Sequence, residues 1–404
     1  MTPVRRQTRT RVVILGWYGS DNTGDEAVLQ AIAAALRKRG VTDLHALSID
    51  PAKTSARLSI TSSPRSLFNP RTLRSLPGAR ALILGGGGLI QDRTSVYNLP
   101  IYALFVLAAR LSGAQVMGWG LGVEPLDTLL GKLLARFICR SAAFFSVRDA
   151  SSKKLLESAG VTPADIRVSA DPALLLVPEP ASDTRPETAQ PKVIFCLRDL
   201  PDNRPGLNLH YLLPIGLRRK LGIGSATRED RRDRFVQVMA RAVSTCTREF
   251  GAAVTFLPLW PGRDEAIMQA VANAAIDLGV SAERLDWARP EPGDVKTVAG
   301  AIGGADLLVS MRLHALIFAA VQGVPFIALA YARKVRGLAR LLGTERWLVE
   351  VETTLPSAEE IEGKLWNLWR TRREQSVAVA VAASQARLRA EQDAETIARL
   401  LRGS

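Results

Sequence analysis

Short apolar runs alternate with longer segments of helical periodicity along most of the 404-residue chain. Such runs are typical of buried strands, and the periodic segments of helices that pack on a sheet. The predicted strands are residues 11–17, 44–49, 80–88, 114–120, 143–147, 192–198, 253–260, 305–310 and 325–331. The predicted helices are residues 25–39, 99–111, 126–140, 150–160, 233–249, 264–278 and 313–322.

This repeated strand–helix order predicts an α/β protein made of two doubly wound, Rossmann-like domains with parallel sheets. Residues 177–191 are rich in proline and polar residues without apolar periodicity, so they are predicted to be a linker. We therefore expect domains at 1–176 and 192–370 and a helical tail at 371–404. Ligands are expected at the carboxyl ends of the strands, with the active site in the cleft between the domains.

The loop after the first strand, "GWYGSDNTGDE", is longer and more polar than a strand–helix connection needs, which indicates a binding loop. Its glycines allow close backbone approach, and the helix that follows points free N–H groups at the same place. Asp25 suits a ligand contact or a simple helix cap equally well. The loop matches neither the dinucleotide fingerprint nor the P-loop pattern. The candidate ligand-binding residues are Gly19, Asn22, Gly24 and Asp25.

A second glycine-rich strand end, "LILGGGGLIQD", occupies residues 82–92. Gly86 and Gly87 fit either tight backbone packing or close approach to a ligand. Asp92, just beyond them, is the better candidate for a contact to substrate hydroxyls.

Two further strand ends, "SVRD" at 146–149 and "SMRLHA" at 310–315, each place an arginine beside a helix N-terminus. Arginine can grip a carboxylate or phosphate with two parallel hydrogen bonds, so Arg148 and Arg312 are candidate anion ligands. His314 shares the first helical turn with Arg312 and is a candidate general acid or base. Ser310 is a further candidate contact. The other two histidines, His45 and His210, are interpreted as structural.

The net charge of +14 and the pI near 10.2 indicate anionic partners. Nucleic acid is one such partner, but no helix-turn-helix, zinc-finger or RRM signature is present, and no nucleic acid is expected. Anionic small molecules or an acidic membrane surface fit the charge equally well. The three cysteines lack paired spacing and are predicted to be buried thiols of a reduced compartment. No cluster suits a metal ion, and no cofactor is expected. Gly323 and Pro325 divide the one long uncharged stretch, so no membrane span is predicted.

Four motifs together resemble the polysaccharide pyruvyl transferase family in their order and spacing. They are the loop "GWYGSDNTGDEAVLQAI", the glycine-rich "LILGGGGLIQD", the segment "FFSVRDASSKKLLESAGV" followed by "ADPAL", and "SMRLHALIFAAVQGVPFIALAY". The likeness covers roughly residues 14–343. It is greatest to the CsaB-like branch, which modifies secondary cell-wall polymers and is connected with S-layer anchoring.

The resemblance implies a GT-B-like fold and phosphoenolpyruvate as the donor. It implies a product with a pyruvate ketal, commonly on O4 and O6 of N-acetylmannosamine in a lipid-linked precursor. By position, Arg148, Arg312 and His314 match the family's donor-binding and catalytic residues, and Lys334 is retained. Where many relatives have "YDPKV", this chain has "YARKV", with Arg336 where an acid is common. This departure bears on the acceptor more than on the donor.

Two other functions remain open from the residues: a nucleotide-sugar glycosyltransferase of the same architecture, and a non-catalytic glycan- or lipid-binding protein. The expected location is the cytoplasm, with peripheral contact at the inner face of the membrane. Residues 207–235 combine apolar residues with clustered cations, as in segments that lie on anionic membranes. An ordinary surface flap and a packing segment in an oligomer are equally compatible with this pattern.

Overall fold

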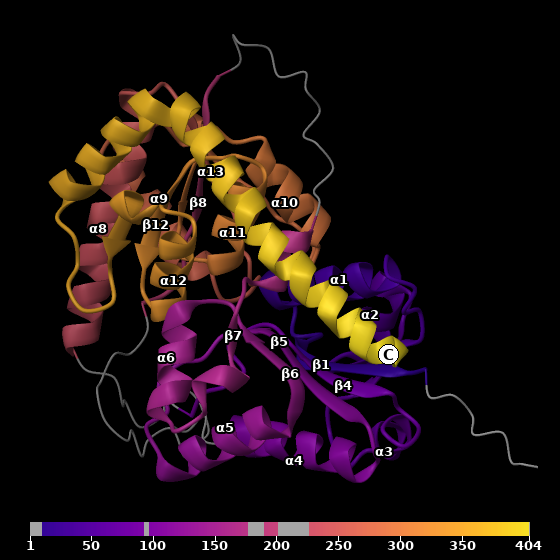
Figure 1. Cartoon of the computed structure of the whole chain (residues 1–404). Coiled ribbons are helices and arrows are strands. Elements are labelled where there is room, and N and C mark those ends of the chain that lie inside the picture. Colours follow the sequence, from indigo (N-terminus) through magenta and orange to yellow (C-terminus); the bar gives the residue numbers. More distant parts are fainter. Residues whose placement is uncertain (1–9, 93–96, 177–189, 201–225, 404) are drawn as a thin grey trace, which may run out of the picture. The chain divides into compact units, whose positions relative to one another are not determined.

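The computed structural model describes residues 10–92, 97–176, 190–200 and 226–403. Contacts within the chain divide it into two units (Figure 1). The first consists of Met1–Ser20, Val28–Leu175 and Arg389–Ser404, and the second of Asp21–Ala27 and Leu176–Leu388. The predicted linker, 177–191, falls almost entirely outside the described residues.

The first unit is built on a seven-stranded parallel sheet with the order β3-β2-β1-β4-β5-β6-β7. Because the order reverses between β1 and β4, the carboxyl ends of these two strands flank a topological switch point. The strands are β1 Val12–Tyr18, β2 Leu44–Ser48, β3 Thr61–Pro64, β4 Ala81–Gly85, β5 Gln115–Leu121, β6 Ala142–Val147 and β7 Arg167–Val168. The α-helices are α1 Thr23–Arg37, α2 Pro51–Leu58, α3 Pro70–Ser75, α4 Asn98–Leu111, α5 Leu129–Ser141 and α6 Ala150–Ser158.

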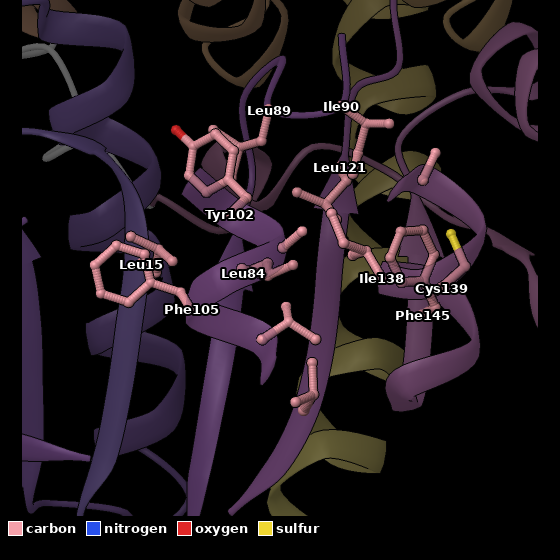
Figure 2. Close-up of a cluster of buried hydrophobic side chains, with 14 of the residues drawn as sticks. Leu15, Leu84, Leu89, Ile90, Tyr102, Phe105, Leu121, Ile138, Cys139 and Phe145 are labelled. Atoms are coloured by element: carbon pink, nitrogen blue, oxygen red, sulfur yellow. The ribbon is translucent and has the colours of Figure 1, made fainter. Parts of the chain in front are cut away.

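Helix α4 connects β4 to β5, and α5 connects β5 to β6. Because both connections run in the same direction along the sheet and such connections are right-handed, the two helices cover the same face of it. Figure 2 shows Tyr102 and Phe105 of α4, with Ile138 and Cys139 of α5, in one apolar cluster with residues of the strands. These side chains are buried because the helices are apolar on the side that faces the sheet.

The second unit repeats the design with a six-stranded parallel sheet, β10-β9-β8-β11-β12-β13, and a switch point between β8 and β11. Its strands are β8 Lys192–Cys196, β9 Ala253–Phe256, β10 Leu285–Trp287, β11 Leu307–Ser310, β12 Phe326–Ala330 and β13 Leu348–Glu350. Its helices are α8 Ala226–Arg248, α9 Glu265–Asp277, α10 Val295–Gly303, α11 Leu313–Val321 and α12 Arg333–Leu341, followed by α13 Ala358–Arg402.

The α/β class and the parallel sheets were predicted correctly, whereas several short elements were not. Strands β3, β10 and β13 have three or four residues each and partly polar or exposed sequences, so they carry little apolar signal. Residues 371–402 of the predicted tail form the greater part of the 45-residue helix α13, which begins earlier, at Ala358. From Arg389 onward the chain groups with the first unit.

The long uncharged stretch is divided as predicted. Helix α11 ends at Val321, Gly323 adopts φ +69°, and β12 begins at Phe326. In the described part of the chain, no helix combines the length and the hydropathy needed to cross a membrane. Cys139, Cys196 and Cys246 are free and buried, in agreement with the prediction of isolated buried thiols.

The two sides of α4 should differ sharply in their contribution to stability. We expect Phe105→Ala, which leaves a cavity under the helix, to lower the free energy of unfolding by about 3–5 kcal/mol. The neighbouring Leu104 is 53% exposed, so Leu104→Ala should change this free energy by no more than about 0.5 kcal/mol. Urea unfolding followed by circular dichroism measures both. Equal losses for the two variants would contradict this packing.

Candidate active site

Arg312 is fixed at the carboxyl edge of the second sheet by a buried carboxylate. It follows β11 and is the N-cap residue of α11. Its Nε donates a 2.9 Å hydrogen bond to Oδ2 of Asp264, and its Nη2 donates a second bond to Oδ1. Oδ2 also accepts the backbone N–H groups of Leu259 and Trp260 at 3.2 and 3.0 Å. The guanidinium is thereby held in one orientation at the switch point between β8 and β11.

Ser310, the last residue of β11, holds the turn that presents Arg312. Its hydroxyl accepts a 2.9 Å hydrogen bond from the backbone N–H of Arg312 and lies 3.1 Å from the carbonyl oxygen of the same residue. Ser310 is fully buried. The structure therefore shows a positioning contact, and the predicted contact between Ser310 and substrate stays a prediction.

Tyr331, directly after β12, lies among three cationic side chains. Nη1 of Arg198 donates a 3.2 Å hydrogen bond to its hydroxyl, and Nζ of Lys334 lies 5.2 Å from the centre of its ring. Burial alone would raise the pKa of Tyr331, but the charges of Lys334, Arg198 and Arg312 favour the phenolate and lower it to about 8. This part of the sheet edge is therefore strongly positive, as an anion site requires.

His314 lies against the opening glycine-rich loop, whose residues Asp21–Ala27 group with the second unit. The loop docks through the backbone N–H of Thr23, which donates a 3.0 Å hydrogen bond to the carbonyl of Leu259. A Cβ atom on Gly24 would stand only 2.0 Å from Nδ1 of His314. Gly24 is thus required for close backbone approach to the imidazole.

The other loop residues have local partners. The side chain of Asn22 donates a 2.7 Å hydrogen bond to Asp25 and accepts one from the backbone N–H of Gly24. Gly19, in the first unit, has φ +72°, and a Cβ atom there would meet Ser48 at 2.2 Å. These contacts account for the composition of the loop, and its predicted binding of substrate remains a prediction.

Arg148, at the end of β6 in the first unit, is held in a comparable way. Its Nη1 donates a 3.2 Å hydrogen bond to Asp171, and its Nε lies 3.7 Å from Asp149. Burial alone would lower the pKa of Arg148, but Asp171, Asp149 and Glu124 outweigh it and raise the pKa. Among the described residues, this Nε is buried without a hydrogen-bond acceptor, and the predicted role of Arg148 as an anion ligand stays a prediction.

The glycine-rich end of β4 has a structural explanation. Gly86 and Gly87 adopt φ +57° and +70°, which other residues rarely tolerate. Asp92 is buried and accepts hydrogen bonds from the backbone N–H groups of Asp127 and Thr128 and from the hydroxyl of Thr128, at 2.6–2.9 Å. It thereby secures the start of α5, whereas its predicted contact with sugar hydroxyls remains a prediction.

Arg336, which departs from the family's usual sequence, pairs with two carboxylates of the same unit. It binds Glu350 and Glu352 at 2.5–2.7 Å. These bonds connect α12 with β13 and the residues after it, so Arg336 is explained by a structural ion pair.

Sequence reasoning missed Asp264, Arg198, Trp260, Tyr331 and Asp171. In the sequence, Asp264 was only the first residue of a predicted helix, where an aspartate usually indicates a cap. In the structure it gives α9 no side-chain cap and pairs with Arg312, 48 positions later. In the described residues, no group of histidine, cysteine and carboxylate side chains is arranged to hold a metal ion.

A model of the family described as polysaccharide pyruvyl transferase matches residues 22–333. The chain belongs to this family. The matched range contains Arg148, Arg312, His314 and Tyr331, and Lys334 lies one residue beyond it. As a member of this family, the protein is a transferase. No curated protein matches the chain by sequence.

The solved structures similar to this family member establish a GT-B-like fold. A glycosyltransferase from Rickettsia africae aligns with a TM-score of 0.60 at 13% identity, over 98% of this chain and 100% of its own. Anabaena HepE, solved with UDP and glucose, aligns with a TM-score of 0.56 at 13% identity, over 96% and 99%. A UDP-GlcNAc 2-epimerase from Methanocaldococcus jannaschii gives 0.54 at 11%, over 89% and 92%. At such identities the likeness concerns the fold alone.

The positive environment of Tyr331 predicts an unusual titration. Ultraviolet absorbance of the phenolate should show one tyrosine ionising near pH 8, because positive neighbours stabilise its charged form. Tyr331→Phe should remove this transition, and Lys334→Met should move it to higher pH. The matched control Tyr97→Phe, at a residue 61% exposed, should leave it unchanged. A transition near pH 8 that survives Tyr331→Phe would show that another group is responsible.

Proposed function

We propose that this enzyme transfers the pyruvyl group of phosphoenolpyruvate to a sugar of a lipid-linked cell-wall polysaccharide precursor. The product is a ketal that joins two hydroxyls of one sugar, with O4 and O6 of N-acetylmannosamine as the proposed acceptor atoms. The proposed biological setting is the CsaB-like one, the modification of secondary cell-wall polymers that serve in S-layer anchoring.

The observation that carries the donor assignment is the cluster of cations at one sheet edge of the second unit. Arg198, Arg312 and Lys334 all act on Tyr331 in this cluster. Phosphoenolpyruvate carries a phosphate and a carboxylate, and oriented guanidinium groups suit both. Arg148 is proposed as a further anion ligand, because its Nε has no acceptor among the described residues.

The reaction needs proton transfer at two stages. In the first, a sugar hydroxyl adds to C2 of the donor, its proton leaves the oxygen, and C3 gains a proton to become a methyl group. In the second, the bond between C2 and the phosphate ester oxygen breaks, a second hydroxyl bonds to C2, and the proton that this hydroxyl releases goes to the departing phosphate. The products are the ketal and inorganic phosphate, so atoms and charges balance.

His314 is proposed as the general acid and base for these transfers. It lies two residues after the fixed Arg312, in the first turn of α11. The absence of a side chain at Gly24 leaves room for its ring. Histidine changes protonation near neutral pH, which suits a group that must both accept and donate a proton. Lys334 and the loop residues Asn22 and Asp25 are proposed to orient the substrates.

The lipid-linked acceptor implies that the enzyme works from the cytoplasm at the inner face of the membrane. Residues 207–235 were predicted to provide contact, but residues 207–225 lie outside the described structure. In the described remainder, Arg231 donates hydrogen bonds to the carbonyls of Val351 and Glu352, and Arg232 pairs with Asp199. These two cations are engaged within the second unit, whereas Arg234 of the same segment is exposed.

A nucleotide-sugar glycosyltransferase is the second candidate. It is favoured by the fold of structural neighbours such as Anabaena HepE, which was solved with UDP and glucose. The two candidates differ in the donor consumed. Phosphate released from phosphoenolpyruvate in the presence of amino-sugar acceptors supports the first, and turnover of UDP- or GDP-sugars supports the second.

His314→Gln should lower the turnover number for phosphate release by about 10²–10⁴-fold with nearly unchanged donor affinity, because it removes proton transfer and keeps the size of the side chain. Arg312→Lys should mainly raise the KM for phosphoenolpyruvate, because lysine cannot form the paired hydrogen bonds. His45→Gln is the control, since His45 contacts Thr61 and Ser63 in the first unit. Near-normal turnover in His314→Gln would refute the acid–base assignment.

A further inference from the structure

Helices α4 and α5 expose a row of large aliphatic side chains. The residues are Ile101, Leu104, Leu107 and Leu111 of α4 and Leu129, Leu130 and Leu133 of α5, here named the α4–α5 outer face. Their exposed fractions run from 38% for Ile101 to 81% for Leu111. Single exposed leucines are ordinary on protein surfaces, whereas a continuous group on neighbouring helices indicates an interaction surface.

These seven side chains are exposed on two helices that pack against each other. The helices are in contact with each other and cover the same face of the first sheet (Figure 1). Phe105 and Ile138 pack inward, as Figure 2 shows. Residues 104, 107 and 111 follow helical spacing on the side away from the sheet. The helices are therefore apolar on both the inner and the outer side.

The charged residues of the two helices are all cations. They are Arg110, Lys132, Arg136 and Arg140, and neither helix contains Asp or Glu. Arg110 and Arg140 are exposed, and Nη1 of Arg110 donates a 3.3 Å hydrogen bond to Ser141 at the end of α5. The nearest carboxylate in the sequence is the exposed Asp127, two residues before α5. Exposed leucines beside cations are typical of helices that lie in the interface of anionic membranes.

We infer that the α4–α5 outer face docks the first unit on an anionic lipid membrane, with the leucines entering the headgroup region and the cations contacting lipid phosphates. A second copy of the chain fits less well. A two-fold symmetric interface on this face would bring the cations of one copy toward the same cations of the other, and like charges oppose association.

This inference goes beyond the proposed function, because it concerns a surface and needs neither donor nor acceptor. It also differs from the contact proposed for residues 207–235, which belong to the second unit. Vesicle flotation without substrates therefore tests it separately from the reaction.

The full chain should float with vesicles of phosphatidylglycerol and phosphatidylcholine and remain unbound with phosphatidylcholine alone. The triple variant Leu104→Gln, Leu111→Gln, Leu129→Gln should bind at least about tenfold more weakly, because it removes apolar insertion. Arg110→Gln with Arg140→Gln should weaken binding by about 25-fold, since each cation near the surface contributes about fivefold. High salt should weaken the wild-type interaction.

The matched control replaces Val377, Val381 and Leu388 of α13 by Gln, since these residues are 52–65% exposed. It should float like the wild type. Circular dichroism and thermal melting establish that each variant is folded, and light scattering measures its mass. Flotation of the triple variant at the wild-type level overturns the inference. So does a wild-type dimer that only the triple variant dissociates, or binding that is abolished only by charge reversal of Arg218, Arg219 and Lys220.

Discussion

The buried pairing of an arginine with a carboxylate at the carboxyl edge of each sheet is the interaction on which the candidate site depends. Removing both charges of such a pair from water has a large cost, and a pair of this kind often adds little net stability. Its consequence here is geometric. Asp264 receives two hydrogen bonds from Arg312 and two from backbone N–H groups, so the position of the arginine is set before any ligand arrives.

This fixed geometry explains the chemistry expected of the second unit. Arg312 is paired with the carboxylate of Asp264, and together with Lys334 and Arg198 it still lowers the pKa of Tyr331. The glycine at position 24 then brings the backbone of the opening loop against His314. An oriented cation, an imidazole and a close backbone segment are features that the proposed transfer of a pyruvyl group from phosphoenolpyruvate would use.

The class of the fold could be predicted from the sequence, because the long apolar strands and the amphipathic helices between them are recognisable from their periodicity. The sequence also placed Arg148, Arg312 and His314 at strand ends beside helix starts, where the structure has them, because such places are recognisable from local patterns. Their roles stay predictions. The sequence was not sufficient for their partners. Asp264 is 48 positions from Arg312 and resembles an ordinary cap, and Asp92 looks like a ligand residue although its contacts secure α5. Such pairings follow from tertiary packing, which no local pattern encodes.

Calorimetric titration of phosphoenolpyruvate into the Asp264→Asn variant tests the central claim most directly. The loss of the negative charge of Asp264 and the loss of its hold on Arg312 predict opposite changes in donor affinity. Removing a negative charge near an anion site should strengthen donor binding if only net charge matters. If Asp264 positions Arg312, binding should weaken by about 10- to 100-fold, corresponding to roughly 1.4–2.7 kcal/mol. The control Asp286→Asn, at an exposed residue of β10, removes the same charge outside the site. Wild-type or tighter binding by a folded Asp264→Asn protein would contradict the account.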